Sequence, residues 1–334
     1  MKRTVALISA IALILIGISM SVYNTFRAAE WENFFKEFAQ TTEGIPETVV
    51  EKGDENNRIA VINIEGVIQD VPQASGLLAG TTGYNHQMTI AALKEIIDDD
   101  STKAIILNVD SPGGGVYESA EIHKYLVEAK EKGKTIYSSM GNMAASGGYY
   151  VSAPADKIFA SKETMTGSIG VIMQSINYHE LAEKHGVKFE TYKSGKMKDM
   201  LSPTKETSDE EKEYVQSLVD TMFDDFVNVV SEGRDMSEEE VRKIADGRVY
   251  LGDAAIENGL VDEEGYFDDA LATLKKEVGK SPQVYMVGGD QSALSFFGMD
   301  APEIFTNLFK NSDVEVIKEL MQKRSGPEPM YLYE

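Results

Sequence analysis

Strand-like and helix-like segments alternate along the central part of this chain, and this order constrains the fold more than any other feature. Apolar, β-branched runs at residues 59–68, 104–109 and 135–139 have the composition of buried strands. Helical periodicity covers the intervening residues 89–99 and 116–132. Because strands joined by helical crossovers pair in parallel, the pattern predicts an α/β fold with a largely parallel sheet.

The remaining segments are less regular. The spacing of Ser208 and Glu211 is that of a capping box, which predicts a helix from there to about residue 230, and a further helix is expected over residues 238–245. Residues 41–58 read as a polar linker, and residues 281–334 as a looser C-terminal part.

The N-terminus predicts a membrane anchor. Lys2 and Arg3 precede an uncharged run at residues 4–23, which at helical rise spans about 30 Å, the thickness of a bilayer core. A cleaved signal peptide, the alternative, usually has a shorter apolar region and a small-residue cleavage site close behind it. We therefore expect residues 1–3 in the cytoplasm, a single span, and the remaining chain outside the cell. The aromatic spacing within residues 31–38 predicts an amphipathic helix before the linker.

Composition excludes several function classes. The net charge is −23, so nucleic-acid binding is not expected, because phosphate contacts require clustered Lys and Arg. The absence of cysteine excludes disulfides, thiol catalysis and cysteine-ligated zinc. The four histidines show no metal-binding spacing. No cofactor or metal is predicted.

Four short motifs could carry chemistry. They are DSPGGG at residues 110–115, AASGG at 144–148, TGSIGV at 166–171 and KSGKMKDMLSP at 193–203. Taken singly, each has an ordinary explanation: a strand-to-helix turn, a helix-capping serine, a turn beside a strand and a solvated lysine loop. Their glycines also let backbone amides approach a ligand, and exposed amides can stabilise an oxyanion.

Taken together and in this order, the motifs resemble signal peptide peptidase A, a family of membrane-bound serine peptidases with a ClpP/crotonase-like fold of repeated β-β-α units. The resemblance covers residues 58–275, the expected peptidase domain, with residues 276–334 as a C-terminal extension. Carried over position by position, it implies a site built from Ser146 as nucleophile, Lys198 as general base, Ser168 as the hydroxyl that orients the lysine, and Gly113 and Gly147 as oxyanion-hole amides, with Gly114 as the alternative to Gly113.

The resemblance also implies partners. The substrates would be signal-peptide remnants and other extended apolar peptides, and the chain would assemble into a homo-oligomeric ring in which neighbouring subunits complete each active site. Lys193 and Lys196 lie close to Lys198, so the choice of base rests on the spacing to Asp199 and to residues 202–203.

The chemistry is plausible on general grounds. A lysine amine accepts a proton only when it is neutral, and burial among apolar groups favours the neutral form. Such an amine can take the proton of a serine hydroxyl that attacks a peptide carbonyl. Three alternatives remain open: a crotonase-like acyl-CoA enzyme, a Ser-His-Asp peptidase that uses His179 or His185, and a membrane scaffold without activity.

The last residues suggest a regulatory role. Residues 330–334, MYLYE, form an apolar and aromatic end on a Gly- and Pro-containing arm. A groove that accepts extended apolar peptides could also accept this tail, and tethering gives it a local concentration of roughly millimolar. We expect the tail to occupy the active site, or to be trimmed by it, and to inhibit partly; the alternative is a merely disordered end.

Overall fold

The computed structural model describes residues 45, 47–70, 84–287 and 330–332 of the chain. The chain divides into two units, residues 1–46 and 47–334, and every element below belongs to the second. The expected anchor at residues 4–23 and the amphipathic helix lie outside the described residues. Within the described ranges, no helix combines the length and the apolar composition needed to cross a bilayer.

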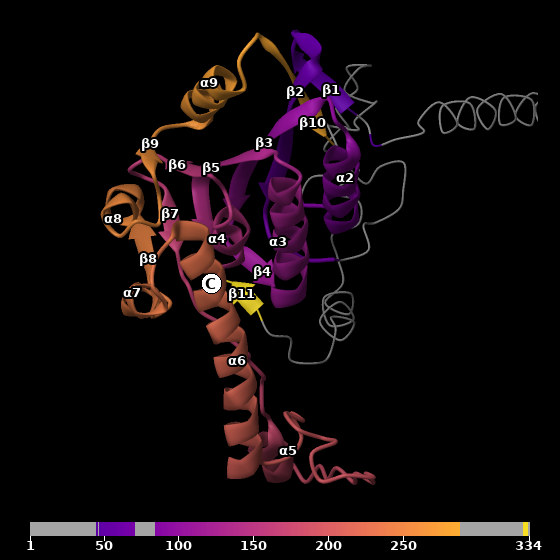
Figure 1. The fold of residues 1–334 in the computed structure, drawn as a ribbon. Coiled ribbons are helices and arrows are strands. Elements are labelled where there is room, and N and C mark those ends of the chain that lie inside the picture. Colours follow the sequence, from indigo (N-terminus) through magenta and orange to yellow (C-terminus); the bar gives the residue numbers. More distant parts are fainter. Residues whose placement is uncertain (1–44, 46, 71–83, 288–329, 333–334) are drawn as a thin grey trace, which may run out of the picture. The chain divides into compact units, whose positions relative to one another are not determined.

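The strands of the described residues form one large mixed sheet and one small one (Figure 1). Their bounds are β1 Glu47–Glu51, β2 Asp54–Glu65, β3 Thr102–Ser111, β4 Gly113–Gly115, β5 Thr135–Ala145, β6 Lys157–Ala160, β7 Met165–Gly167, β8 Val249–Leu251, β9 Glu263–Glu264, β10 Pro282–Val287 and β11 Met330–Leu332. The large sheet has the order β1-β10-β2-β3-β5-β6-β9, with β7 beside β5 and β8 beside β7. Strands β10, β2, β3, β5, β6 and β9 run parallel, as the alternating pattern predicted.

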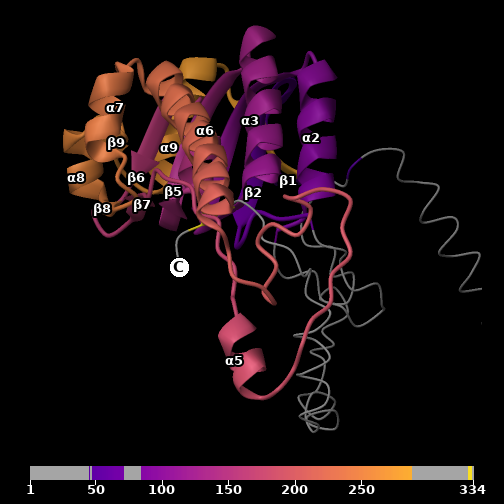
Figure 2. The same ribbon diagram turned by 90° about the horizontal axis from the view of Figure 1, so that it is seen from below.

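Helices cover both faces of this sheet, and Figure 2 shows α2, α3 and α6 side by side on one of them. The helix bounds are α2 His86–Asp98, α3 Val116–Glu131, α4 Gly147–Ser152, α5 His179–Lys184, α6 Asp209–Arg234, α7 Glu238–Ile244, α8 Gly252–Glu257 and α9 Phe267–Val278. The capping box predicted for Ser208 and Glu211 is present at the start of α6.

Alternate residues of the central strands enter two separate cores. In β2, Ile62 and Ile64 pack with α2, α3 and α6, while Ile59 and Val61 pack with α9 on the opposite face. Burial on both faces explains why these strands read as continuous apolar runs in the sequence.

Two expectations about the ends of this unit were wrong. Residues 47–51 form strand β1, and β2 begins at Asp54, where a polar linker was predicted. Residues 282–287 form β10, which lies between β1 and β2 and so belongs to the main sheet, although they were expected in a loose C-terminal extension. Both segments are short and partly polar, and only their pairing with distant strands reveals them.

Candidate active site

Ser146 lies where β5 ends and the short helix α4 begins. Its backbone has φ 54° and ψ −117°, a conformation that costs about 1–3 kcal/mol and clusters at functional sites. Its side chain makes no capping hydrogen bond to α4, although capping is the common role of a serine at this position. The residue is only 1% exposed. This combination of strain, burial and missing cap fits a nucleophile better than a helix cap.

Ser168 lies at the end of the neighbouring strand. Ala145 of β5 is in register with Gly167 of β7, and the Ser146 N–H donates to the Gly167 carbonyl at 2.8 Å. Ser146 and Ser168 therefore each follow one member of an aligned pair on adjacent strands. Ser168 also has a positive φ, 49°, and its N–H donates to the carbonyl of Arg248 at 2.8 Å. The structure thus brings together two of the serines that the motifs singled out.

Gly113, Gly114 and Gly147 lie within contact distance of one another beside Ser146. A Cβ built on Gly113 would lie 2.6 Å from the Gly147 nitrogen, and one built on Gly147 would lie 3.1 Å from the Gly114 nitrogen. No side chain fits at these positions, which explains the glycines of two separate motifs. The Gly113 N–H donates to Ser111 Oγ at 3.1 Å. Gly114 and Gly147 are therefore the better placed amides for an oxyanion.

The C-terminal tail lies along this glycine strand. Strand β11 pairs antiparallel with β4, with Tyr331 opposite Gly114 (Figure 1). A Cβ built on Gly113 would lie 2.0 Å from the Tyr331 carbonyl oxygen, and one built on Gly147 would lie 3.1 Å from the same oxygen. The tail lies beside the motif glycines, as the expected occupation of the site requires, and the Tyr331 carbonyl faces them; trimming and inhibition stay predictions.

The Tyr331 side chain fills an aromatic pocket. Its ring stacks on Tyr150 at 4.9 Å between centroids and lies 4.7 Å from Phe226, while its hydroxyl donates to the Met222 carbonyl at 3.1 Å. Tyr331 is 1% exposed. The apolar walls and the single acceptor at the base make a site for a tyrosine-like side chain.

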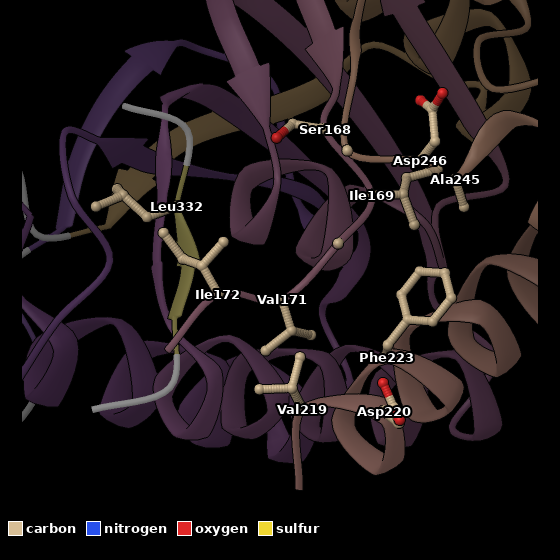
Figure 3. Close-up of a pocket in the computed structure, with 12 residues that line it drawn as sticks. Ser168, Ile169, Val171, Ile172, Val219, Asp220, Phe223, Ala245, Asp246 and Leu332 are labelled. Carbon is tan, nitrogen blue, oxygen red and sulfur yellow. The ribbon is translucent and has the colours of Figure 1, made fainter. Parts of the chain in front are cut away.

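A cavity of about 430 Å³ opens beside Ser168 (Figure 3). Its walls come from the segment after Ser168, including Val171 and Ile172, and from α6 through Val219 and Phe223. Leu332 of the tail closes another side. The lining also includes the carboxylates of Asp220 and Asp246, which would favour the protonated form of an amine that entered this space.

Lys198 does not join Ser146 within this chain. It is exposed, and its loop is held at the start of α6 by the ion pair of Lys196 with Glu210. Phe226, on the same helix, is the residue whose ring contacts α4 through Tyr150. The helical rise puts Glu210 and Phe226 roughly 24 Å apart along α6. The described contacts therefore hold the lysine loop away from the nucleophile of its own chain.

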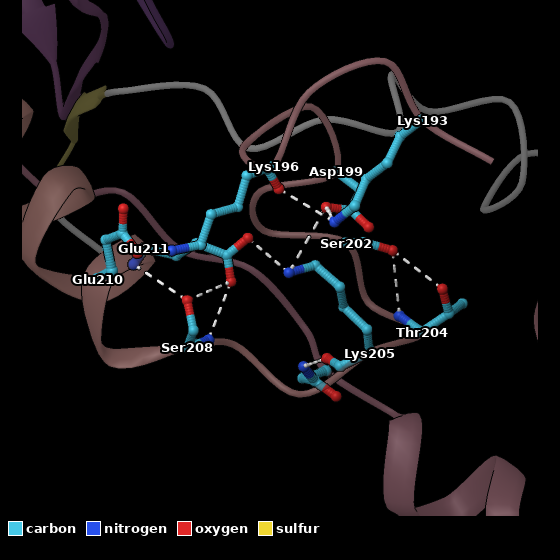
Figure 4. Close-up of polar contacts among 10 residues, drawn as sticks. Lys193, Lys196, Asp199, Ser202, Thr204, Lys205, Ser208, Glu210 and Glu211 are labelled. Carbon is cyan, nitrogen blue, oxygen red and sulfur yellow. Dashed lines mark hydrogen bonds and ion pairs between the residues drawn. The ribbon is translucent and has the colours of Figure 1, made fainter. Parts of the chain in front are cut away.

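The neighbouring lysines are all engaged in ion pairs (Figure 4). Lys193 pairs with Asp199 at 2.6 Å, Lys196 with Glu210, and Lys205 with Glu211 at 2.5 Å. Among the described residues, no hydrogen bond or ion pair engages the Lys198 amine. Lys193 and Lys196 are thus paired, whereas the described residues provide no such partner for Lys198.

The histidines do not form a triad with Ser146. His86 lies 2.9 Å from Glu121, and His179 Nδ1 lies 3.0 Å from the carbonyl oxygen of Thr204. His185 is exposed, and burial lowers the pKa of His123 to about 4. Across the described part of the chain, no hydrogen bond joins a histidine to Ser146.

Sequence reasoning missed the aromatic pocket. Tyr150 belongs to the serine motif, but its partner Phe226 is 76 positions away in α6, so no local pattern links them. Sequence reasoning also missed Ser119 of α3, which is fully buried next to Gly147. Its Oγ is the one buried side-chain oxygen or nitrogen without a hydrogen-bond partner in the described residues. For the aromatic pocket, the signal available in the sequence was Tyr150, which lies two positions after the glycine pair at residues 147–148.

Comparison with known proteins places the chain in a family. The family model described as Peptidase family S49 matches residues 128–281, a range that contains Ser146, Ser168 and Lys198. A protein of Enterococcus faecium that carries the name signal peptide peptidase SppA is 49% identical over 233 residues, which cover 70% of this chain and 67% of that protein. Protease 4 of Haemophilus influenzae is 32% identical over 277 residues, or 82% of this chain and 43% of that protein.

Among solved structures, a mutant ClpP1 of Listeria monocytogenes matches with a TM-score of 0.38 and 18% identity, covering 63% of this chain and 94% of that one. The family assignment rests on the sequence matches alone. The chain therefore belongs to peptidase family S49 and is a serine peptidase related to signal peptide peptidase A.

Proposed function

We propose that the protein is a serine endopeptidase in which Ser146 is the nucleophile and Lys198 of a neighbouring subunit is the general base. The observation that carries the proposal is the placement of the tail. A peptide strand pairs with the glycine strand β4 and turns the Tyr331 carbonyl toward the glycines beside Ser146. A substrate bound in the same way presents its scissile carbonyl to the nucleophile. We also propose that the peptidase domain has a ClpP/crotonase-like fold.

In the proposed reaction, the Ser146 Oγ attacks the substrate carbonyl carbon while the hydroxyl proton moves to the Lys198 amine. The carbonyl oxygen becomes an oxyanion that accepts hydrogen bonds from the Gly114 and Gly147 amides. Such a donor is typically worth about 3 kcal/mol in the transition state. The C–N bond then breaks as the leaving amine takes the proton from Lys198, and water hydrolyses the acyl-enzyme by the reverse proton transfers. Ser168 orients the amine.

Two features support supply of the lysine by another subunit. The first is the separation of roughly 24 Å along α6 between Glu210, which pairs with the lysine loop, and Phe226, which contacts α4 through Tyr150. The second is the apolar surface of the segment that carries Lys198: Ile176 is 80% exposed, Leu181 60% and Tyr192 91%. An exposed apolar segment of this kind is typical of a protein–protein interface. We propose that it packs on a neighbouring copy, places Lys198 near the Ser168 cavity and so closes a homo-oligomeric ring.

The aromatic pocket indicates the substrate class. If the tail binds as a substrate does, Tyr331 occupies the position immediately before the cleaved bond. Extended apolar peptides with Tyr or Phe at that position are the proposed substrates, and remnants of signal peptides are candidates because their central region is apolar. The uncharged run at residues 4–23 supports a single-pass membrane anchor with the catalytic part outside the cell.

Peptide-library digestion tests this substrate class. We expect cleavage after Tyr and Phe to exceed cleavage after Ala by at least about tenfold in kcat/KM, because an empty aromatic pocket forgoes the burial of a large ring. The Ser146→Ala variant, digested in parallel, controls for contaminating peptidases. Equal cleavage after small and aromatic residues would contradict the pocket assignment.

The pH profile tests the base. Lysine amines titrate near pH 10 in water, and a base must be deprotonated to act, so kcat/KM should rise with pH on the alkaline side of neutrality. The rate limb should be unchanged in His179→Ala and His185→Ala. A limb near pH 6.5 that disappears in either histidine variant would show that a histidine serves as the base.

A further inference from the structure

The loop that carries Lys198 is closed by a cluster of two lysines and two carboxylates (Figure 4). Asp199, the next residue after Lys198, lies 2.6 Å from the Lys193 amine and 3.7 Å from the Lys205 amine. The Lys205 amine also lies 2.5 Å from Glu211 Oε1. Lys205 therefore bridges the residue next to the proposed base and the first turn of α6.

Glu211 makes this connection rigid. Its Oε2 accepts hydrogen bonds from the Ser208 N–H at 2.9 Å and from the Ser208 hydroxyl at 3.0 Å, and its own N–H donates to Ser208 Oγ. Glu211 is 2% exposed, although its neighbours in this turn are charged and exposed. A buried carboxylate needs a cation, and Lys205 supplies it. The lysine loop is thus tied to the capping box of a long helix.

The cluster also sets the local charge. A carboxylate beside an amine favours the protonated amine, which is the wrong form for a general base. The hydrogen bond from Lys193, with a further contribution from Lys205, holds the pKa of Asp199 below its usual range, so its negative charge is present when the enzyme works. The two lysines of the cluster balance the two carboxylates, Asp199 and Glu211.

Other charged groups near this loop are paired in the same way. Lys196 pairs with Glu210 and Lys212 with Asp209, both at the start of α6. On α5, His179 lies 3.8 Å from Glu183. Two exposed carboxylates, Glu206 and Glu213, flank the cluster in the sequence and are the same in every variant compared below.

We propose that Lys205 is a positioning residue for Lys198: by bridging Asp199 and Glu211 it fixes the loop and cancels the carboxylate charge that would keep the amine protonated. This inference rests on the proposed function, in which Lys198 is the base. In this inference, Lys205 contacts neither the substrate nor Ser146, and it acts through the protonation of the Lys198 amine.

The test measures kcat/KM against pH for the full-length protein and its variants. Lys205→Met leaves one uncompensated negative charge, so the alkaline limb should move to higher pH by about half a unit, a loss of roughly threefold at any pH below the limb. Asp199→Asn leaves one extra positive charge, so its limb should move to lower pH. Lys205→Arg keeps the charge and should restore the wild-type limb.

Lys243→Met is the matched control, because Lys243 has an exposed ion pair with Glu239 on α7, away from the lysine loop, and should leave the limb in place. Thermal unfolding confirms that each variant is folded. Unmoved limbs, or shifts of the same sign in Lys205→Met and Asp199→Asn, overturn the inference and leave Lys205 a purely structural residue. Full turnover in Lys198→Ala overturns the proposed function instead, so the two failures are distinguishable.

Discussion

Ser146→Ala and Lys198→Ala should each lower kcat/KM for peptide hydrolysis by about a thousandfold or more, with the fold intact. The nucleophile and its base act as a unit, so removing either one removes most of the chemical rate enhancement. Neither change creates a cavity in the main core, because Ser146 loses one oxygen and Lys198 is exposed. Peptide hydrolysis is followed with a fluorogenic substrate, and circular dichroism reports folding.

Mixing the two inactive variants tests whether the site is shared between subunits. In an assembly formed from equal amounts of both, a site takes Ser146 from one chain and Lys198 from the next, so about a quarter of the sites should be complete. Activity should therefore return to about a quarter of the wild-type value after dissociation and reassembly. A mixture that stays inactive while still forming mixed assemblies shows that both residues come from one chain.

Removing residues 325–334 should strengthen peptide binding by about tenfold or more. The tail pairs with the strand that a substrate needs, and its tether keeps its local concentration roughly millimolar. Binding of a labelled peptide to the Ser146→Ala protein, with and without the tail, measures the competition without cleavage. In the active enzyme, mass spectrometry should detect chains that end at Tyr331, because its carbonyl faces the glycines.

Two tail variants provide the matched controls. Tyr331→Ala removes the stack on Tyr150 and Phe226 and should reproduce most of the effect of the deletion. Tyr331→Phe keeps the stack, loses only the hydrogen bond to the Met222 carbonyl and should change peptide affinity by only a fewfold. Unchanged peptide affinity after deletion, together with intact C-termini, would mean that the tail has no regulatory role.

Local sequence patterns predicted the helices α2, α3, α6 and α7 and the central parallel strands β2, β3 and β5. Helix α3 was expected over residues 116–132 and spans Val116–Glu131, and α7 was expected over residues 238–245 and spans Glu238–Ile244. Capping residues and apolar periodicity act within one or two turns, so the sequence carries them directly. The motifs likewise indicated Ser146 and Ser168, which the fold places at adjacent strand ends.

Contacts between residues far apart in the chain could not be predicted from local sequence patterns. Strand β10 is recognisable only beside β1 and β2, and the aromatic pocket needs Tyr150 and Phe226 to meet across two helices. The ion cluster around Lys205 depends on how a loop folds back on α6. Such contacts follow from tertiary packing, which overrides local preference and leaves little trace in short windows.

The position of β10 has a consequence for how the protein is made. Strand β2 lies between β3 and β10, and the side chains of Arg58 and Gln283, hydrogen-bonded across that junction, are 225 positions apart in the chain. Contacts of such long range slow folding, because the loop entropy is lost before the contact forms. A nascent chain that lacks residues 282–287 therefore exposes an open strand edge, which invites pairing with other chains. Synthesis of the C-terminal part relieves this aggregation hazard.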